Sequence, residues 1–200
     1  CPSSWLPEET RAAMGAAAVR GALAVGYRNA GTMEFLVDAE GRYYFLEMNT
    51  RLQVEHTVTE MVYGVDLARE QLRVASGLPL SFAQEDLRRK GHAIEVRICA
   101  EDPEQGFFPS GGTIDHLELP GGPGVRLDAA LYEGQEVTLF YDSMIGKLVC
   151  WGEDRDAALR RTRSALREFV ISGIQTTIPF TLQLLQQPEI VAGRYDTGYL

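Results

Sequence analysis

The chain has few cysteines and no close pair of them. Only three of its 200 residues are cysteine, namely Cys1, Cys99 and Cys150. An odd number of widely spaced thiols excludes a disulfide scaffold and a zinc ribbon, because both need closely paired cysteines. This pattern suits a reducing compartment, and we interpret all three thiols as structural or incidental.

Long apolar runs and an excess of basic charge are also missing. No stretch approaches the roughly 20 apolar residues that span a bilayer, and the N-terminus lacks the basic-then-apolar pattern of a secretion signal. The formal net charge of −9 argues against a nucleic-acid partner, because phosphate backbones are bound by clustered Lys and Arg. We therefore expect a cytoplasmic protein that binds neither membrane nor nucleic acid. Its 45% hydrophobic content can fill one sizeable core or two modest ones.

The first part of the chain predicts helices and two paired strands. Glycines and good capping residues separate segments of helical and of alternating period. The expected elements are a helix from Pro7 to Val25 ended by Gly26, a strand over 31–38, a hairpin-like connection over 39–42, an extended segment over 45–55, a helical stretch capped by Thr57 or Thr59 and interrupted by Gly64, and a helix from Asp66 to Gly77.

The second part predicts short strands and two further helices. Residues 79–91 lack an apolar period and carry a charged run, so we expect a connection there, with domains over 1–78 and 92–200. Short alternating runs among Gly and Pro clusters predict a mainly antiparallel sheet. We expect strands over 92–99, 113–119, 125–127, 136–140 and 147–151, and helices over 154–170 and 178–187.

The most informative segment runs from Phe45 to Glu60. Its odd positions carry polar groups, and the even positions between them are mostly apolar. In an extended chain these odd positions face one side. A half-buried strand with a solvated face shows the same alternation, but Thr, Ser and Lys, which are usual on such faces, are absent from the five odd positions over 47–55. The polar row consists of Glu47, Asn49, Arg51, Gln53 and Glu55.

These residue types predict a metal site and an anion site. Pairing of the two strands would bring Glu34 near Glu47, and the carbonyl of Asn49 would complete an all-oxygen cluster. Mg²⁺ prefers a few protein carboxylates together with substrate phosphates. The forked guanidinium of Arg51 suits a planar oxyanion such as bicarbonate or a carboxylate. Glu55, four residues further on, could accept a proton from that guest as a general base.

Four motifs together resemble the biotin carboxylase subunits and domains of biotin-dependent carboxylases. They are Glu47–His56 followed by Thr59–Met61, Gly91–Arg97, Ala100–Asp102 and Tyr141–Leu148. Motifs of this length and spacing are far more specific than a short glycine pattern. The resemblance covers nearly all of the chain. It implies an α+β fold, in which the C-terminal portion of an ATP-grasp domain is followed by the mainly antiparallel biotin carboxylase C-terminal domain with packed helices.

The resemblance also implies residue roles. In this family ATP phosphorylates bicarbonate to carboxyphosphate, which releases carbon dioxide to the N1 nitrogen of biotin on a carrier domain. The implied roles are ATP binding by Glu34 and Glu47, coordination of Mg²⁺ or Mn²⁺ by Glu34, Glu47 and Asn49, bicarbonate binding by Arg51, Gln53 and the backbone of Val54, catalysis by Arg51 and by Glu55 as general base, and biotin binding by Arg97.

The family further implies a biotin carboxyl carrier domain and a carboxyltransferase as partners. A homodimer stays open, because Pro123 replaces an aromatic residue that is often near the dimer contact. Thr57 stands where the family commonly has proline, which changes no catalytic group. The glycine-rich phosphate lid and the nucleotide-binding lysines are missing from this sequence, so we expect the 200-residue chain alone to be inactive.

Two other functions are compatible with part of the sequence pattern. A different ATP-grasp carboxylate ligase would keep the metal cluster, but would have no reason to carry Arg97 and the Tyr141–Leu148 motif. A non-catalytic module for assembly or carrier binding would not need all five polar odd positions. Without the resemblance, Arg97 would be interpreted as a surface ion pair with Glu95.

Overall fold

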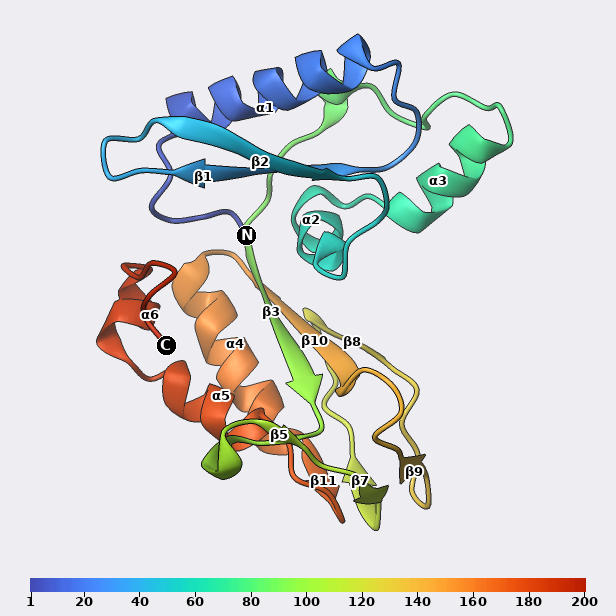
Figure 1. The fold of residues 1–200 in the computed structure, drawn as a ribbon, viewed down its shortest axis with the longest axis vertical. Helices are drawn as coiled ribbons and strands as arrows, with labels where there is room; N and C mark the ends of the chain where they lie inside the picture. The colour runs from blue at the N-terminus through green and yellow to red at the C-terminus, as the bar shows by residue number, and fades with distance from the viewer. The chain divides into compact units, whose positions relative to one another are not determined.

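The computed structural model describes all 200 residues and divides into two compact units (Figure 1). We call Ser3–Arg89 the hairpin unit, and Cys1–Pro2 together with Lys90–Leu200 the sheet unit. Every strand pair is antiparallel, which confirms the α+β class and the mainly antiparallel second region. None of the helices combines the length and the apolar character that crossing a membrane requires.

The hairpin unit is built on two antiparallel strands that follow a long helix (Figure 1). A Cβ at Gly21 would lie 2.8 Å from the Cε atom of Met33, so the glycine allows the helix to approach the first strand closely. No residue of that helix is buried. The elements are α1 (Glu8–Ala24), β1 (Thr32–Val37), β2 (Tyr43–Asn49), α2 (His56–Tyr63), α3 (Leu67–Ala75) and the 3₁₀ turn η1 (Gln84–Asp86).

Two local predictions in this unit are wrong and one is confirmed. The extended segment ends at Asn49 and not at Glu55, because residues 50–55 turn into α2. Neither Thr57 nor Thr59 caps α2. Glu55 occupies the N-cap position without a side-chain cap bond. Asp66 does cap α3, since its carboxylate accepts a 2.8 Å hydrogen bond from the backbone N–H of Arg69.

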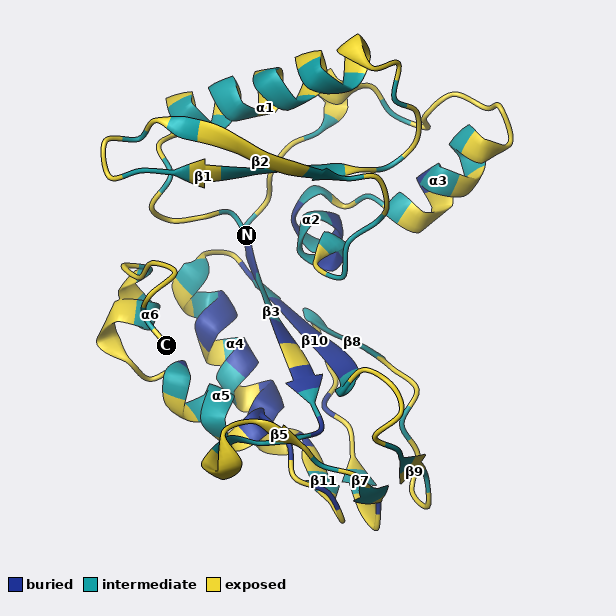
Figure 2. Cartoon of the chain, in the orientation of Figure 1, coloured by how far each residue is buried: buried dark blue, intermediate teal, exposed yellow.

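The sheet unit packs one helix on a three-stranded sheet of order β3-β10-β8. Its core joins one face of the sheet to α4, and this region is the darkest in Figure 2. Leu148 and Cys150 of β10 are fully buried against Leu159 and Leu166 of α4. The strands are β3 (His92–Cys99), β4 (Glu101–Asp102), β5 (Phe108–Pro109), β6 (Gly112–Thr113), β7 (His116–Glu118), β8 (Val125–Ala129), β9 (Glu136–Val137), β10 (Met144–Gly152) and β11 (Val170–Ser172). The helices are η2 (Pro103–Gln105), α4 (Arg155–Glu168), α5 (Ile178–Leu184) and α6 (Pro188–Ala192).

Boundaries in the sheet unit differ from the predicted ones, and the strand predicted over 113–119 is divided into β6 and β7. The helix predicted over 154–170 ends at Glu168, and Val170–Ser172 forms a strand paired with β7. The predicted helix over 178–187 ends at Leu184, and a second short helix begins at Pro188. A proline has a fixed φ and no N–H, so it favours the first position of a new helix over the interior of an old one. The strand predicted over 136–140 keeps only two residues.

One exposed ionic cluster joins β7 to the loop before β9. The Nδ1 atom of His116 lies 2.8 Å from Glu133 Oε1, and its Nε2 atom lies 3.1 Å from Glu118 Oε1. The same Glu133 oxygen accepts a 3.0 Å hydrogen bond from the N–H of Leu117. Hydrogen bonds to Glu118 and to Glu133 raise the pKa of His116 above its ordinary 6.5. The cluster is therefore complete only while the imidazole is protonated on both nitrogens.

This geometry predicts a pH-dependent share of stability. A raised pKa in the folded state means that His116 contributes stability below pH 6.5, and that the contribution is lost as the pH rises through the folded pKa. We expect His116→Gln to reduce the free energy of unfolding at pH 6 and to have no effect at pH 9, in urea titrations of the full-length protein. Glu118→Gln should lower the pKa of His116 toward its ordinary value in an NMR titration. An equal effect of His116→Gln at both pH values would contradict the account.

Candidate functional site

Two carboxylates face each other across the β1–β2 hairpin. Glu34 is the register partner of Glu47, which confirms that the two strands bring them together. The Nδ2 atom of Asn49 donates a 2.8 Å hydrogen bond to Glu34 Oε1 and a 3.1 Å bond to Glu47 Oε1. A register shift follows directly, between Glu34 and Phe35. Bulges of this kind re-aim neighbouring side chains. The two acids and the amide therefore form one connected cluster.

The donor set of this cluster fits a hard divalent cation. It offers two carboxylates and one amide, and the structure contains no group of three or more His, Cys, Asp or Glu that could hold a metal by itself. Mg²⁺ and Mn²⁺ sites commonly use one or two carboxylates and take their other ligands from phosphates and water. The residues present fit that kind of open site.

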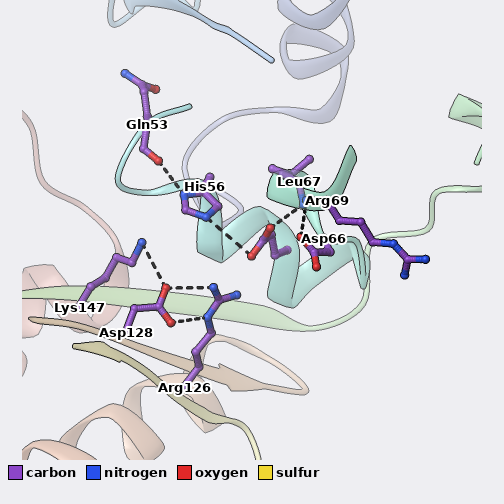
Figure 3. A network of polar contacts seen from close by, with 9 residues as sticks. Gln53, His56, Asp66, Leu67, Arg69, Arg126, Asp128 and Lys147 are labelled. Atoms are coloured by element: carbon purple, nitrogen blue, oxygen red, sulfur yellow. Dashed lines mark hydrogen bonds and ion pairs between the residues drawn. The ribbon is translucent and has the colours of Figure 1, made fainter. Parts of the chain in front are cut away.

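Gln53 also contacts this cluster, although the backbone around it is a turn and not the predicted extended segment. Its Nε2 atom donates a 2.7 Å hydrogen bond to Glu34 Oε1. The chain turns beside it, since the N–H of His56 donates to the carbonyl of Gln53 at 3.3 Å and the His56 Nδ1 atom lies 2.7 Å from that carbonyl oxygen (Figure 3). Gln53 therefore approaches Glu34 because the backbone bends, and not because a strand continues.

Arg51, Val54 and Glu55 lie on this turn and not on the strand face. The expectation that the polar row continues along one extended face is therefore wrong beyond Asn49. Arg51 is exposed, and its Nη1 atom donates to the carbonyl of Leu52 at 3.3 Å. Glu55 is exposed at the N-cap position of α2, and Val54 is partly buried. Hydrogen bonds connect Glu34 to Asn49 and Gln53, and Asn49 to Glu47.

Glu60 is a buried acid to which the sequence assigned no role. Only 8% of it is exposed, and its Oε1 atom accepts a 2.6 Å hydrogen bond from the N–H of Leu67 at the start of α3. Its Oε2 atom lies 3.8 Å from the Nε2 atom of His56. The spacing of four residues between His56 and Glu60 places both on one side of a helix, and this was the available signal. Glu60 holds the connection between α2 and α3 in place.

In the sheet unit, Arg97 lies on β3 opposite Lys147 of β10. Arg97 is exposed, whereas Lys147 is 7% exposed. The Lys147 Nζ atom lies 3.6 Å from Asp128 Oδ2, and Asp128 receives two hydrogen bonds from Arg126, at 2.8 and 3.0 Å (Figure 3). The Arg126 hydrogen bond is the main cause that lowers the pKa of Asp128. Glu95 lies two residues before Arg97 on the same strand.

Comparisons with known proteins agree with this architecture. A family model described as the biotin carboxylase C-terminal domain matches residues 95–200, and one described as the carbamoyl-phosphate synthase L chain, ATP binding domain, matches residues 1–83. The chain is 54% identical over 200 residues to biotin carboxylase 1 of Bacillus subtilis, and 50% identical over 199 residues to the biotin carboxylase of Haemophilus influenzae. Both alignments cover 100% of this chain and 44% of the relative.

A solved structure shows the same fold. The biotin carboxylase domain of a thermophilic 2-oxoglutarate carboxylase, determined with bicarbonate bound, matches with a TM-score of 0.97 and 47% identity, over 100% of this chain and 45% of that one. The hairpin fold and the ATP-binding match place the first unit in the ATP-grasp class. The chain belongs to the biotin carboxylase family. It spans about 44% of the length of the curated relatives that it matches.

The hydrogen bond between Gln53 and Glu34 is expected to stabilise the turn over residues 50–55. Gln53→Ala removes a side-chain hydrogen bond worth roughly 1 kcal/mol, so the backbone amides of residues 54–58 should exchange about fivefold faster with deuterium. Hydrogen–deuterium exchange of the full-length protein measures this rate. Gln84→Ala, an exposed glutamine of the same unit, is the matched control. Unchanged exchange in the Gln53 variant would show that the side chain does not hold the turn.

Proposed function

We propose that the full-length protein is an ATP-dependent biotin carboxylase. It uses MgATP to activate bicarbonate as carboxyphosphate and carboxylates the N1 nitrogen of carrier-bound biotin. The observation that carries the proposal is the connected cluster of Glu34, Glu47, Asn49 and Gln53, which leads directly into a turn that presents Arg51 and Glu55. Family membership supplies the chemistry for which this cluster is suited.

Solved complexes of related proteins support the substrates. One structure of the Hydrogenobacter thermophilus enzyme is a dimer in complex with MgADP, ADP and bicarbonate, and another structure, from Campylobacter jejuni, is a complex with an ATP analogue. These ligands were found in the related proteins. We propose the same ligands for this chain, because it is 47% and 46% identical to the two proteins over nearly its whole length.

Glu34, Glu47 and Asn49 would hold Mg²⁺ or Mn²⁺ beside the nucleotide. When bound, the cation bridges nucleotide phosphates and neutralises charge during phosphoryl transfer. The hairpin keeps the two carboxylates in register, so the ligands are positioned before the nucleotide arrives. Glu34 also holds Gln53, which connects the nucleotide residues to the bicarbonate residues.

Bicarbonate would be bound by Arg51, Gln53 and the backbone N–H of Val54. Glu55 would deprotonate it. The guanidinium fork of Arg51 can donate to two oxygens of a planar anion. Glu55 begins α2 with an exposed carboxylate, which is an accessible proton acceptor. Removing that proton makes the bicarbonate oxygen a better nucleophile toward the γ-phosphate of ATP. Arg51 is thus both a binding and a catalytic residue in this proposal.

Arg97 would bind biotin. Its exposed guanidinium on β3 can donate to the ureido oxygen of biotin and to oxygens of carboxyphosphate. The proposal also includes a biotin carboxyl carrier domain, a carboxyltransferase and a homodimer as partners, in the cytoplasm. The dimer is supported by the dimeric relative from Hydrogenobacter thermophilus.

The role of Glu55 is tested by Glu55→Gln in the full-length protein. We expect bicarbonate- and biotin-dependent ADP release to fall by about 10²- to 10⁴-fold, because a general base is lost. The thermal unfolding midpoint of the Glu55→Gln variant should equal that of the wild type, because the side chain is exposed. Glu9→Gln removes an exposed carboxylate of the same unit and serves as control. Normal carboxylation by the Glu55 variant would rule out the general-base role and favour a scaffold.

The metal assignment is tested by Glu47→Gln. The substitution keeps the shape of the side chain and removes one of two carboxylate charges. We expect the Mn²⁺ concentration for half-maximal ADP release to rise by about tenfold or more, equivalent to at least 1.4 kcal/mol of binding free energy. Electron paramagnetic resonance of Mn²⁺ in the presence of ADP measures the same affinity without turnover. Equal Mn²⁺ affinity in both proteins would exclude Glu47 as a ligand.

A further inference from the structure

Lys147 is unusual in the chain because it is a buried lysine. The chain has only two lysines, Lys90 and Lys147, and Lys147 is 7% exposed. Lysine is almost never buried unless it is paired, because removing an ammonium group from water costs several kcal/mol. Its position in the sheet therefore needs a reason. The hydrophobic core does not supply one, since the core contains Leu148 and Cys150, which point to the opposite face of β10.

Lys147 occupies the central strand, with a charged residue on each side. Its register partner on β3 is Arg97, and its register partner on β8 is Asp128. These three side chains form one row across the sheet. At the far end of the row, Arg126 holds Asp128 by two hydrogen bonds of 2.8 and 3.0 Å, and Lys147 lies 3.6 Å from the same carboxylate (Figure 3).

The backbone pattern places Arg97 and Lys147 close together. The backbone N–H and C=O groups of Ala93 form hydrogen bonds with Cys1. The backbone N–H and C=O groups of Cys99 form hydrogen bonds with Thr177. The backbone polar groups of the odd-numbered residues of β3 therefore point away from β10. The pair of Arg97 and Lys147 is therefore not hydrogen-bonded. In such pairs the Cα atoms lie only about 4.5 Å apart and the side chains are closest.

Two cations directly opposite each other destabilise a sheet. A sheet shaped by stability alone would have placed an acid or an apolar residue beside Arg97. Asp128 and Arg126 anchor Lys147 from the other side, so its ammonium is held beside Arg97 in a partly desolvated environment. Desolvation strengthens the electrostatic influence of one charge on its neighbour. A pair of like charges that lies directly opposite in the sheet points to a function.

We propose that Lys147 is a positioning residue that acts through Arg97. Its charge raises the positive potential at the Arg97 guanidinium, so that Arg97 binds more tightly to an oxygen that carries or gains negative charge. The ligand class is a carboxyl or phosphoryl oxyanion, or a ureido oxygen that becomes negative as its ring nitrogen reacts. This inference rests on the proposed assignment of biotin to Arg97, and extends it to the residues that tune that arginine.

The test compares five variants of the full-length enzyme, four with a single substitution and one that combines Arg97→Met with Lys147→Met. Lys147→Met keeps the length of the aliphatic chain and removes the charge. Lys147→Arg restores the charge. Lys90→Met removes the other, exposed lysine and is the matched control. Arg97→Met tests the proposed biotin assignment independently. Each protein is assayed for ADP release at saturating bicarbonate while the concentration of free biotin is varied, and for bicarbonate-dependent ADP release without biotin.

We expect Lys147→Met to lower kcat/KM for biotin by about tenfold to a hundredfold, to lower the biotin-independent rate by a smaller factor, and to leave the thermal midpoint within about 3 °C of that of Lys90→Met. Lys147→Arg should recover most of kcat/KM. The combination of Arg97→Met and Lys147→Met should be no worse than Arg97→Met alone, because a residue that acts through Arg97 has no effect in its absence.

The outcomes separate this inference from the proposed function. If Arg97→Met leaves kcat/KM for biotin unchanged, the biotin assignment of Arg97 fails, and the inference fails with it. If Arg97→Met is impaired while Lys147→Met behaves like Lys90→Met, only the inference fails. A loss in Lys147→Met that affects both assays equally, lowers the thermal midpoint and is not rescued by Lys147→Arg would mean a structural lysine and would overturn the proposal. Additive losses in the double variant would also overturn it.

Discussion

The hydrogen bonds of one amide to two opposed carboxylates are the interaction on which the candidate site depends. Glu34 and Glu47 are direct partners across an antiparallel hairpin, where like charges repel. The Asn49 amide donates to both of them, and the Gln53 amide donates to Glu34 as well. Two amides thereby offset the repulsion in the absence of a cation. The same arrangement keeps the carboxylates convergent, which an arriving divalent cation requires.

This cluster also determines where the following residues lie. The chain leaves the strand after Asn49 and bends into α2, and the Gln53 side chain is bonded to Glu34 at this bend. The bend presents Arg51 and Glu55 on a turn, next to a helix whose own acid, Glu60, is buried and bonded to the start of α3. A rigid hairpin on one side and a fixed helix on the other hold the short turn between them. Such support is what a binding loop needs to keep its geometry.

The sequence predicted the pairing of the strands but not the shape of the turn. Alternation in β1 and β2 and the glycine connection correctly indicated that Glu34 meets Glu47. The same alternation over 50–55 wrongly indicated an extended chain, because polar residues at every second position occur by coincidence in a turn whose bonds are made by backbone carbonyls. Asp66 was recognisable as a cap from its residue type, whereas Glu55 occupies the N-cap position of α2 without a side-chain bond and left no such signal. Likewise β11 was not predicted, because Val170 continues the apolar pattern of α4 and only the partner strand β7 decides its conformation.

The burial of Lys147 could not be predicted from the sequence, for a related reason. A charged residue in an alternating strand is expected on the solvated face, and only the register with Arg97 and Asp128 shows that it lies in a row of charges. Residue types and spacing thus indicated which groups carry chemistry, while the neighbours that tune those groups come from distant strands.

The most direct measurement is ADP release from MgATP by the full-length wild-type protein, with bicarbonate and biotin each supplied or withheld. The account predicts that release requires bicarbonate and is strongly accelerated by biotin. Release that is indifferent to both would contradict the account, and would leave this family member acting on another carboxylate.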